Sequence, residues 1–530
     1  MSVAGASASR TVRQGDAMHA ADAQRDQVDV LVVGGGINGV AIARDAAGRG
    51  LSVLLCEQDD LAAHTSSASS KLIHGGLRYL EQYEFALVGK ALAERDVVLN
   101  SAPHIVRPLR FVLPHEPHLR PGWMIRAALL LYDNLGRRRA HSLINSRRVD
   151  LREHVAGAAL KPQFDKGFIY SDAWCDDARL VVLNALDAAA RGAQILTRTR
   201  CTQVRRADTG WTAQLRGAAG TVRQIQARAL VNATGPWAAS FLDDITNVPH
   251  QHKLRLVKGS HIVVNKLYDH AYAYTFQQSD RRIVFAIPFE RDYTLIGTTD
   301  TEFSGAPEAV AIDSGEIDYL CAAASRYFAR PVAPADVVWS YSGVRPLLED
   351  ASSAAADVTR DYLLDCDNAA GAPLLNVFGG KITTHRKLAE EALDWLAPAL
   401  GNTHAAWTSA GDVRLPGAEF ADRRRIDAGF DAYLHQVVQR FPWLPGGMAL
   451  RYARAYGTRV DKVIGNAGRL ADLGENLGAD LYAAEVDYLV REEWARSADD
   501  ILWRRSKLGL RIGEQGHLRL AAFLSGSRTP

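Results

Sequence analysis

The sequence predicts an α/β fold in three parts: a parallel sheet flanked by helices, an antiparallel sheet that caps it, and a helical domain at the carboxyl end. Near the amino terminus, an apolar run at 28–33 leads through a glycine-rich turn into an alanine-rich helix. Strand-like segments recur between about 241 and 345, and helix-like patterns dominate 401–530. The two sheets therefore precede the helical domain along the chain.

Composition sets the broad class of the protein. A chain of 530 residues can divide into about two to four domains. Its 62 basic and 60 acidic residues leave a net charge of +2, which gives no global electrostatic case for nucleic-acid binding. The cysteines show neither metal-site spacing nor a disulfide framework, so we expect no metal and a reducing, cytosolic setting: Cys56, Cys175, Cys201, Cys321 and Cys366.

Two further segments bear on targeting. Residues 1–27 lack the apolar run of a secretory signal, and we expect a flexible extension there. The apolar stretch at 127–132 is far shorter than the ~20 residues that cross a bilayer. The sequence therefore predicts no membrane-spanning helix.

The turn after the first strand, at 34–39, carries three spaced glycines. Gly34 permits a tight turn, Gly36 lets the backbone approach a pyrophosphate, and Gly39 allows the helix to pack closely on the strand. The helix amino terminus offers N–H groups to phosphates. Strand, turn and helix together predict a Rossmann-like dinucleotide site.

The second strand, at 52–56, ends at Glu57. A carboxylate in this position accepts hydrogen bonds from a ribose 2′-hydroxyl, which disfavours a nucleotide phosphorylated there. The motif does not distinguish NAD from FAD.

A segment at 65–80 is rich in small hydroxyl residues and reads as a loop by composition. Distinctive motifs follow at 232–237, 258–261, 297–300, 342–346, 359–362 and 378–384. In this order they closely resemble the aerobic, FAD-dependent glycerol-3-phosphate dehydrogenases, over nearly everything from Val28 onward. The main departures are the amino-terminal extension and the loop near 351–357.

The resemblance implies FAD as the cofactor, with the 65–80 segment lining the flavin. The cofactor-binding residues it implies are Gly34, Gly36, Asn38, Gly39, Glu57, Thr65, Ser66, Ser67, Ser70, Lys71, Leu72, His74, Gly75, Gly235, Trp237, Gly380, Lys381, Ile382 and Thr383.

Two of these motifs also have a physical interpretation. The strand at 230–235 ends in Gly235, where the main chain can lie against a flat cofactor without a side chain intervening. The motif at 378–381 precedes a helix with apolar residues at helical spacing: Leu388, Ala392, Leu393 and Leu396. We expect the helix amino terminus, with Lys381, to stabilise negative charge on a reduced flavin.

The resemblance also implies the substrate, glycerol 3-phosphate, and its product, dihydroxyacetone phosphate. It places Arg345, Arg360 and Lys381 at one pocket above the flavin, and Arg78 and Tyr79 are further candidates for substrate binding. Arginine can bind a phosphate with two parallel hydrogen bonds.

Oxidation at C2 requires a group that accepts the hydroxyl proton. His261 is the first candidate because its ordinary pKa suits the task, although such a histidine can also simply satisfy a core hydrogen bond. Arg345 is the rival for this role. The predicted catalytic residues are therefore His261, Arg345 and Lys381.

A segment at 120–139 combines apolar residues with Arg137, Arg138 and Arg139. It suits a lipid interface, and the alternative is a helix packed on the cap domain. The resemblance implies a peripheral enzyme at the inner face of the cytoplasmic membrane that passes electrons to a quinone. A homodimer is possible, and the helical domain is expected to serve packing, dimerisation or partner contact.

The expected domains are a flexible extension at 1–27, an oxidoreductase region at 28–400 and a helical domain at 401–530. Within the oxidoreductase region, the FAD-binding domain covers about 28–100, 165–240 and 341–400, and the cap domain covers about 101–164 and 241–340. Two other functions remain open: an oxidase acting on glycerol 3-phosphate or an amine with oxygen, and a non-catalytic flavin-binding regulatory protein.

Overall fold

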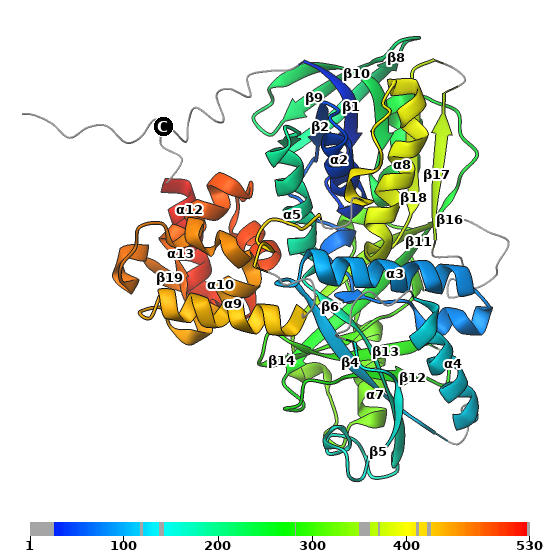
Figure 1. Cartoon of the computed structure of the whole chain (residues 1–530), viewed down its shortest axis with the longest axis vertical. Coiled ribbons are helices and arrows are strands. Elements are labelled where there is room, and N and C mark those ends of the chain that lie inside the picture. The colour runs from blue at the N-terminus through cyan, green and yellow to red at the C-terminus, as the bar shows by residue number, and fades with distance from the viewer. Residues whose placement is uncertain are drawn as a thin grey trace, which may run out of the picture.

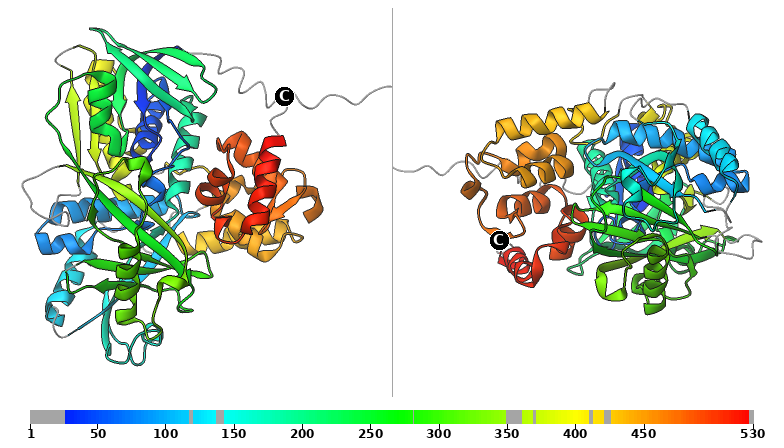
Figure 2. Two further views of the ribbon diagram at one scale, coloured as in Figure 1. Left: turned by 180° about the vertical axis from the view of Figure 1, so that it is seen from behind. Right: turned by 90° about the horizontal axis from the view of Figure 1, so that it is seen from below.

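The computed structural model describes residues 26–116, 120–136, 143–280, 282–348, 361–368, 371–409, 413–420 and 426–526. In Figure 1 they form one sheet with its helices at the top, a second sheet below it, and a helical domain to one side. The views in Figure 2 also show the helical domain beside the two sheets. The three-part α/β fold predicted from the sequence is confirmed.

The first sheet has a parallel centre of apolar strands. Its order is β17, β18, β10, β1, β2, β7, and β9 and β8 continue from β10. The pairs β1–β10, β1–β2, β10–β18 and β2–β7 are parallel, whereas β17 is antiparallel to β18. The strands are β1 Gln27–Val33, β2 Val53–Cys56, β7 Gln194–Leu196, β8 Thr199–Arg206, β9 Trp211–Gly217, β10 Val222–Asn232, β17 Tyr362–Asp367 and β18 Leu374–Gly379.

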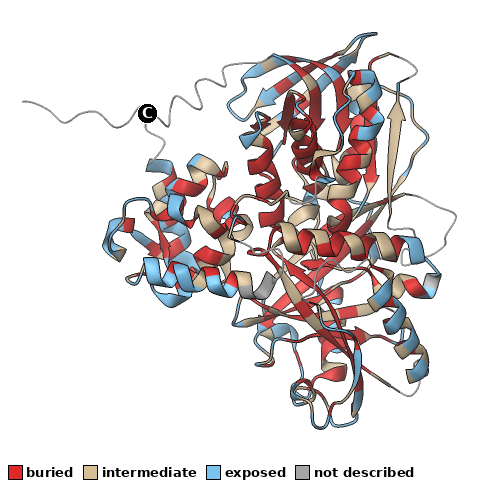
Figure 3. Cartoon of the chain, in the orientation of Figure 1, coloured by how far each residue is buried: buried red, intermediate tan, exposed pale blue. Residues whose placement is uncertain are grey.

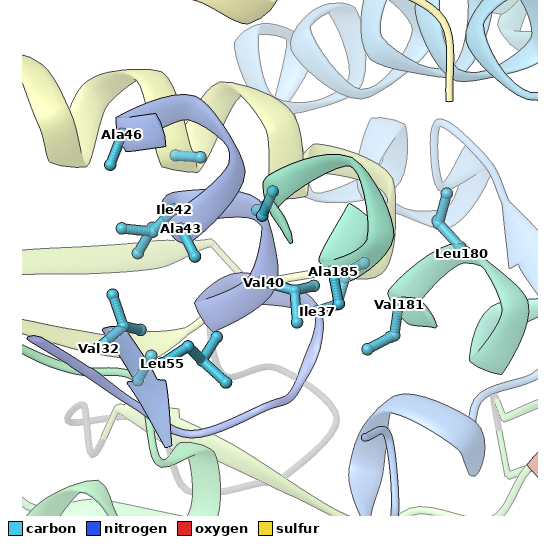
Figure 4. Packing of buried hydrophobic residues seen from close by; sticks show 14 of the residues in the cluster. Val32, Ile37, Val40, Ile42, Ala43, Ala46, Leu55, Leu180, Val181 and Ala185 are labelled. Carbon is cyan, nitrogen blue, oxygen red and sulfur yellow. The ribbon is translucent and has the colours of Figure 1, made fainter. Parts of the chain in front are cut away.

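Three helices pack together against this sheet: α2 Ile37–Gly48, α5 Asp177–Ala190 and α8 His385–Leu400. Figure 4 shows α2 lying over Val32 and Leu55 of β1 and β2, with alanines at the contact. Small side chains let the helix approach the strands closely, and this fixes its amino terminus at the end of β1. The apolar face predicted for α8 is buried, since none of its four residues is exposed to solvent: Leu388, Ala392, Leu393 and Leu396.

The second sheet has the order β15, β11, β14, β13, β12, β4, β6, β3, with β16 beside β11 and β5 beside β6. It is antiparallel as expected except for the parallel pair β4–β12, so the sheet is mixed. The strands are β3 Leu72–Ile73, β4 Val106–Pro114, β5 Arg147–Asp150, β6 Lys166–Cys175, β11 Leu254–Asn265, β12 Ala273–Gln277, β13 Ile283–Phe289, β14 Tyr293–Gly297, β15 Thr301–Glu302 and β16 Val337–Leu348.

Four helices complete these two parts: α3 Phe85–Ser101, α4 Gly122–Leu135, α6 Ala238–Phe241 and α7 Ser314–Tyr327. The expected domain boundaries near 165 and 341 fall at the start of β6 and within β16. Both strands pair in the second sheet. The chain therefore crosses between the two sheets several times, and the junction between them is built from segments distant in sequence.

The carboxyl-terminal part is helical, as the sequence predicts. It contains α9 Ile426–Arg440, α10 Gly446–Tyr456, α11 Val460–Ile464, α12 Ala483–Glu492, α13 Gly513–Gly526 and a small hairpin of β19 Asn476–Gly478 and β20 Leu481–Tyr482. Buried ion pairs dock it on the first sheet: Arg505 Nη2 lies 2.8 Å from Asp60 Oδ1, and Arg179 Nη2 lies 3.0 Å from Glu493 Oε1.

Candidate functional site

The glycine turn after β1 has the geometry that the sequence predicts. Gly34 has a φ of +113°, and a Cβ there would lie 2.4 Å from the Ala233 carbonyl oxygen. A Cβ on Gly39 would lie 1.9 Å from the Gly34 carbonyl oxygen, so helix and strand are as close as glycine allows. The Ser66 hydroxyl accepts a hydrogen bond of 3.0 Å from the Ile37 N–H at the start of α2.

A cavity of about 170 Å³ lies beside this turn, lined by Gly34, Gly36, Glu57 and Gly235 among others. Glu57 is buried and accepts hydrogen bonds from the N–H groups of Gly35 at 2.6 Å and Asp59 at 2.8 Å. Its burial raises its pKa, which the two N–H donors oppose. The carboxylate is therefore held in place at the cavity wall.

Two observations show that these residues fit a dinucleotide. Asn38 donates to the Gly379 carbonyl oxygen at 3.2 Å, while its own Oδ1 is buried without a hydrogen-bond partner in the described part of the chain. Such an atom suits a ligand that supplies a donor. Gly235 has a φ of +59° and open space where a Cβ would point, so the main chain there can be approached closely.

Most predicted cofactor residues of the 65–71 stretch use their side chains to fix the chain itself. The Thr65 hydroxyl donates to the Val344 carbonyl oxygen at 2.7 Å, and that of Ser67 donates to the His64 carbonyl oxygen at 3.3 Å. Lys71, only 1% exposed, donates to both carboxylate oxygens of Asp177 at 2.9 Å and to the Ser67 carbonyl oxygen at 3.0 Å. Its three donors are thereby used.

The remaining predicted cofactor residues lie either near the glycine turn or where the 65–80 segment meets the start of α8. Gly380 adjoins the glycine turn, since a Cβ there would lie 3.2 Å from Asn38 Nδ2. The His74 N–H donates to the Thr383 hydroxyl at 3.3 Å, which joins the 65–80 segment to the start of α8. Leu72, Gly75 and Ile382 lie along the same two segments. Trp237 lines the cavity beside the glycine turn and donates to Glu308 at 3.3 Å.

His261 lies on β11 and is 1% exposed. Its Nε2 is 2.9 Å from the Ser70 hydroxyl, its ring stacks on Tyr341 with centroids 4.8 Å apart, and Nδ1 has no partner among the described residues. Burial lowers the pKa of His261 well below 6.5, and the charges of Arg345 and Lys71 lower it further. With Nε2–H donated to Ser70, neutral Nδ1 can accept a proton.

Arg345 lies on β16 opposite Val257 of β11, four residues before His261, and its guanidinium group lies close to Gly259. It forms an ion pair with Asp300 and donates to the Thr298 hydroxyl at 3.0 Å. A Cβ on Gly379, two residues before Lys381, would lie 3.4 Å from the Pro346 carbonyl oxygen. The two segments that carry Arg345 and Lys381 are therefore packed against each other.

Lys381 and the 77–82 segment provide the other predicted substrate residues. Lys381 Nζ lies 3.9 Å from the centre of the Tyr79 ring. Arg78 is half-buried and has neither an ion pair nor a hydrogen bond within the described residues. Arg360 lies outside the described residues. Tyr79 and Lys381 thus lie together, and His261, Arg345 and Lys381 are carried by segments that pack on one another: β11, β16 and the end of β18.

Three contributors were not recognised as site residues in the sequence. Asp300 pairs with Arg345, Tyr341 stacks on His261, and Asp177 neutralises Lys71. Asp300 falls within the 297–300 motif, and Tyr341 precedes the 342–346 motif. The sequence motifs therefore indicated the region of both residues, although not their roles. Asp177 carried none, because its partner is 106 positions away.

Comparison with known proteins gives two family matches. Residues 29–386 match the family of FAD-dependent oxidoreductases, and residues 409–522 match the C-terminal domain of alpha-glycerophosphate oxidase. The first match ends at the start of α8, and the second begins between α8 and α9. FAD is therefore the cofactor of this protein, consistent with the cavity and the unpaired Asn38 oxygen.

Individual relatives cover almost the whole chain. A glycerol-3-phosphate dehydrogenase of Pseudomonas aeruginosa is 54% identical over 94% of both chains. D-erythritol 1-phosphate dehydrogenase of Brucella abortus is 48% identical over 93% of this chain and 96% of its own. Among solved structures, glycerol-3-phosphate dehydrogenase of Bacillus halodurans with FAD matches with a TM-score of 0.73 and 27% identity, covering 93% of this chain and 88% of the other.

The close approach at Gly39 gives a test of the cofactor site. Replacing Gly39 with Ala places a Cβ 1.9 Å from the Gly34 carbonyl oxygen and must push α2 away from the turn. We expect purified Gly39→Ala protein to carry clearly less FAD per chain than the wild type, measured by flavin absorbance after denaturation. Gly446→Ala is the control, because nothing lies within 4 Å of a Cβ there. Full FAD content in Gly39→Ala would contradict this description of the turn.

Proposed function

The chain belongs to the FAD-dependent glycerol-3-phosphate dehydrogenases, and from that premise we propose that it oxidises sn-glycerol 3-phosphate at C2 to dihydroxyacetone phosphate. The observation that carries the proposal is the unpaired Nδ1 of His261, which stays neutral under the influence of burial and of the positive charge of Arg345 on the adjacent strand. A proton acceptor and a cation in one place are what oxidation of a phosphorylated secondary alcohol requires.

Bound FAD supplies a hydride acceptor for the hydrogen on C2. His261 accepts the C2 hydroxyl proton at Nδ1 while Ser70 holds Nε2. The low pKa of His261 arises partly from Arg345. A dianionic phosphate beside Arg345 offsets that positive charge, and so makes His261 a better base once the substrate is bound.

Arg78, Arg345 and Lys381 supply the positive charge for the phosphate, with Arg360 as a further candidate. A hydrogen bond to a charged group contributes about 1.5–3 kcal/mol. Two such bonds favour glycerol 3-phosphate over glycerol by roughly 10²–10⁴. Arg345 is partly neutralised by Asp300, so its contribution falls at the lower end.

Anaerobic titration of the holoenzyme tests this function. Glycerol 3-phosphate should bleach the flavin at concentrations at least about 100-fold below those of glycerol. Arg345→Gln should weaken the response to glycerol 3-phosphate more than the response to glycerol. Arg152→Gln is the control, because Arg152 is exposed and pairs with Asp150 far from the site.

Other outcomes of the titration separate the alternatives. Bleaching by D-erythritol 1-phosphate alone would make the substrate assignment wrong. The absence of bleaching by any polyol phosphate would favour a non-catalytic flavoprotein. In air, release of peroxide in place of quinone reduction would identify an oxidase.

His261 makes a separate prediction for the chemical step. His261→Asn should slow flavin reduction by about 10²–10⁴, with little change in the dissociation constant of the substrate. Because a depressed pKa keeps the ring neutral, the wild-type rate should not fall between about pH 8 and 6.5. Stopped-flow absorbance measures the rate of flavin reduction and its pH dependence. His517→Asn is the control, because His517 is exposed. Unchanged reduction in His261→Asn would leave Arg345 as the candidate.

We also propose that the enzyme binds a membrane surface and passes electrons to a quinone there. Support comes from α4, which exposes Trp123, Leu130 and Leu131 at 71%, 46% and 40% while burying Leu129 and Tyr132. Figure 3 shows the exposed positions along the outer face of this helix. Arg126 of α4 donates a hydrogen bond to the Ser146 hydroxyl. The exposed Arg147 and Arg148 follow Ser146 directly in the chain. Apolar side chains beside cations suit an anionic lipid interface.

The exposed aromatic residues Tyr83 and Phe85, at 80% and 40%, lie before and at the start of α3, which contacts α4. Among the described residues, no helix is both long enough and apolar enough to cross a bilayer. Contact through α4 therefore requires only that side chains enter the interface. The predicted contribution of Arg137, Arg138 and Arg139 lies outside the described residues.

Vesicle binding tests the membrane proposal. Burying an apolar side chain of this size contributes about 1.5–3 kcal/mol. Replacing Trp123, Leu130 and Leu131 together with Ser should weaken cosedimentation with anionic phospholipid vesicles more than tenfold. Trp395→Ser is the matched control, since Trp395 is 58% exposed on α8, in the other part of the molecule. Equal binding by the triple variant and the wild type would remove α4 from the proposal.

A further inference from the structure

The 74–79 segment, which carries Arg78 and Tyr79, has little freedom at its start. A Cβ on Gly75 would lie 2.5 Å from Leu92 Cδ2 and 2.8 Å from the Tyr132 hydroxyl. Gly76 follows with a φ of +78°, where a side chain is strained. The main chain is thus pressed against α3 and α4 immediately before it turns into the short 3₁₀ helix Leu77–Gln82.

Tyr132, on α4, holds this point through its hydroxyl. The Gly75 N–H donates to Tyr132 Oη at 2.9 Å, and Tyr132 Oη donates to Asp172 at 2.8 Å. Arg95 Nη1, from α3, donates to Asp172 Oδ1 at 2.9 Å. Burial and Asp172 raise the pKa of Tyr132, so the hydroxyl keeps the proton that it donates.

This network is costly to bury. Asp172 and Tyr132 are each 2% exposed, and Arg95 is 6% exposed. A buried ion pair contributes little net stability compared with apolar residues of similar size, so its main effect is to select one geometry. The network meets the main chain at two points: Arg95 Nη1 donates to the Ser171 carbonyl oxygen at 3.1 Å, and the Gly75 N–H donates to Tyr132. Ser171 adjoins Asp172 within β6, so Gly75 is the separate segment whose position the network fixes.

Resting on the function proposed above, we propose that Tyr132 is a positioning residue for substrate binding. Through the Gly75 N–H it fixes the turn that places Arg78, the half-buried cation without a partner in the described residues, and Tyr79, whose ring contacts Lys381. Asp172 and Arg95 act through Tyr132. None of the three needs to touch the substrate.

Loss of the Tyr132 hydroxyl should change substrate affinity rather than the rate of the reaction at C2. Tyr132→Phe keeps the ring but removes the acceptor that lies 2.9 Å from the Gly75 N–H, so that only the Asp172 carboxylate still faces this N–H. Loss of this hydrogen bond loosens the turn at the base of Arg78. Affinity for the phosphate group should fall, since it depends on where Arg78 lies. In the proposed function, the reaction at C2 depends on His261 and Ser70, which lie outside the 74–79 segment.

The chain offers a matched control in Tyr170. It lies in the same apolar cluster, its ring is 6.1 Å from that of Tyr132, and its hydroxyl is 2.8 Å from the Thr275 hydroxyl. Tyr170→Phe removes an equally buried hydroxyl without touching the 74–79 segment. General loosening of the cluster would affect both variants alike.

The experiment compares the wild type, Tyr132→Phe and Tyr170→Phe as holoenzymes. We expect the dissociation constant for glycerol 3-phosphate to rise on the order of tenfold in Tyr132→Phe alone, with the limiting rate of flavin reduction and the binding of glycerol nearly unchanged. Amide hydrogen exchange at 75–79 should accelerate in the same variant. The same changes in Tyr170→Phe, or none in Tyr132→Phe, would overturn the proposal.

The exchange measurement separates this proposal from the function on which it rests. If wild-type protein binds no glycerol 3-phosphate, the proposed function fails, whereas faster exchange at 75–79 in Tyr132→Phe still reports the hydrogen bond. If glycerol 3-phosphate binds and reduces the flavin but exchange and affinity are identical in all three proteins, the function stands and Tyr132 has no positioning role.

Discussion

The buried ion pair between Lys71 and Asp177 is the constraint on which the site depends. Both side chains are excluded from solvent, and each is fully hydrogen-bonded: Lys71 to Asp177 and Ser67, Asp177 also to Ser69 and the Ala178 N–H. Removing one partner of such a pair costs about 3–5 kcal/mol, because the other charge remains buried. The pair ties the 65–80 segment to the start of α5, so this segment is part of the core rather than a free loop.

From that anchor the segment runs between the two sheets and is fixed at successive points. Ser70 holds His261 of the second sheet, His74 is held by Thr383 before α8, and Gly75 is held by Tyr132 of α4. The proposed membrane face and the proposed substrate site therefore share α4, whose inner side carries Tyr132. The segment is therefore held by β11, α4, α5 and the residues before α8. Such a fixed segment suits a reaction that needs base, cation and cofactor in one arrangement.

The backbone geometry of the glycine turn was accessible from the sequence because its requirements are local. The need for glycine at Gly34 and Gly39 arises from backbone geometry within a few residues, and the position of Glu57 follows from the length of the strand before it. The three-part fold was equally accessible, since strand and helix periodicity are local patterns. The parallel pair β4–β12 was not, because strand direction depends on the path between strands 160 or more positions apart.

The roles of charged side chains were harder to predict, since they depend on distant partners. Lys71 was predicted to bind cofactor from its motif, and only the fold reveals Asp177 against it. Ser70 and His261 are 191 positions apart, and Tyr132 lies 57 positions from Gly75. In each case the residue type was informative, but the contact that decides its role arises only when the second sheet folds back on the first.

Charge balance at the proposed substrate site is the reason that we assign a role to the placement of Arg78. Lys71 is neutralised by Asp177 and Arg345 partly by Asp300, so neither offers a full charge to an entering dianion. Arg78 has no such counter-charge among the described residues. A bare cation contributes to affinity only if it is held within hydrogen-bonding reach, because lost side-chain entropy and solvent screening otherwise offset its attraction. In the proposed site, the geometry of the Gly75 turn therefore sets how much Arg78 adds to the contributions of Arg345 and Lys381.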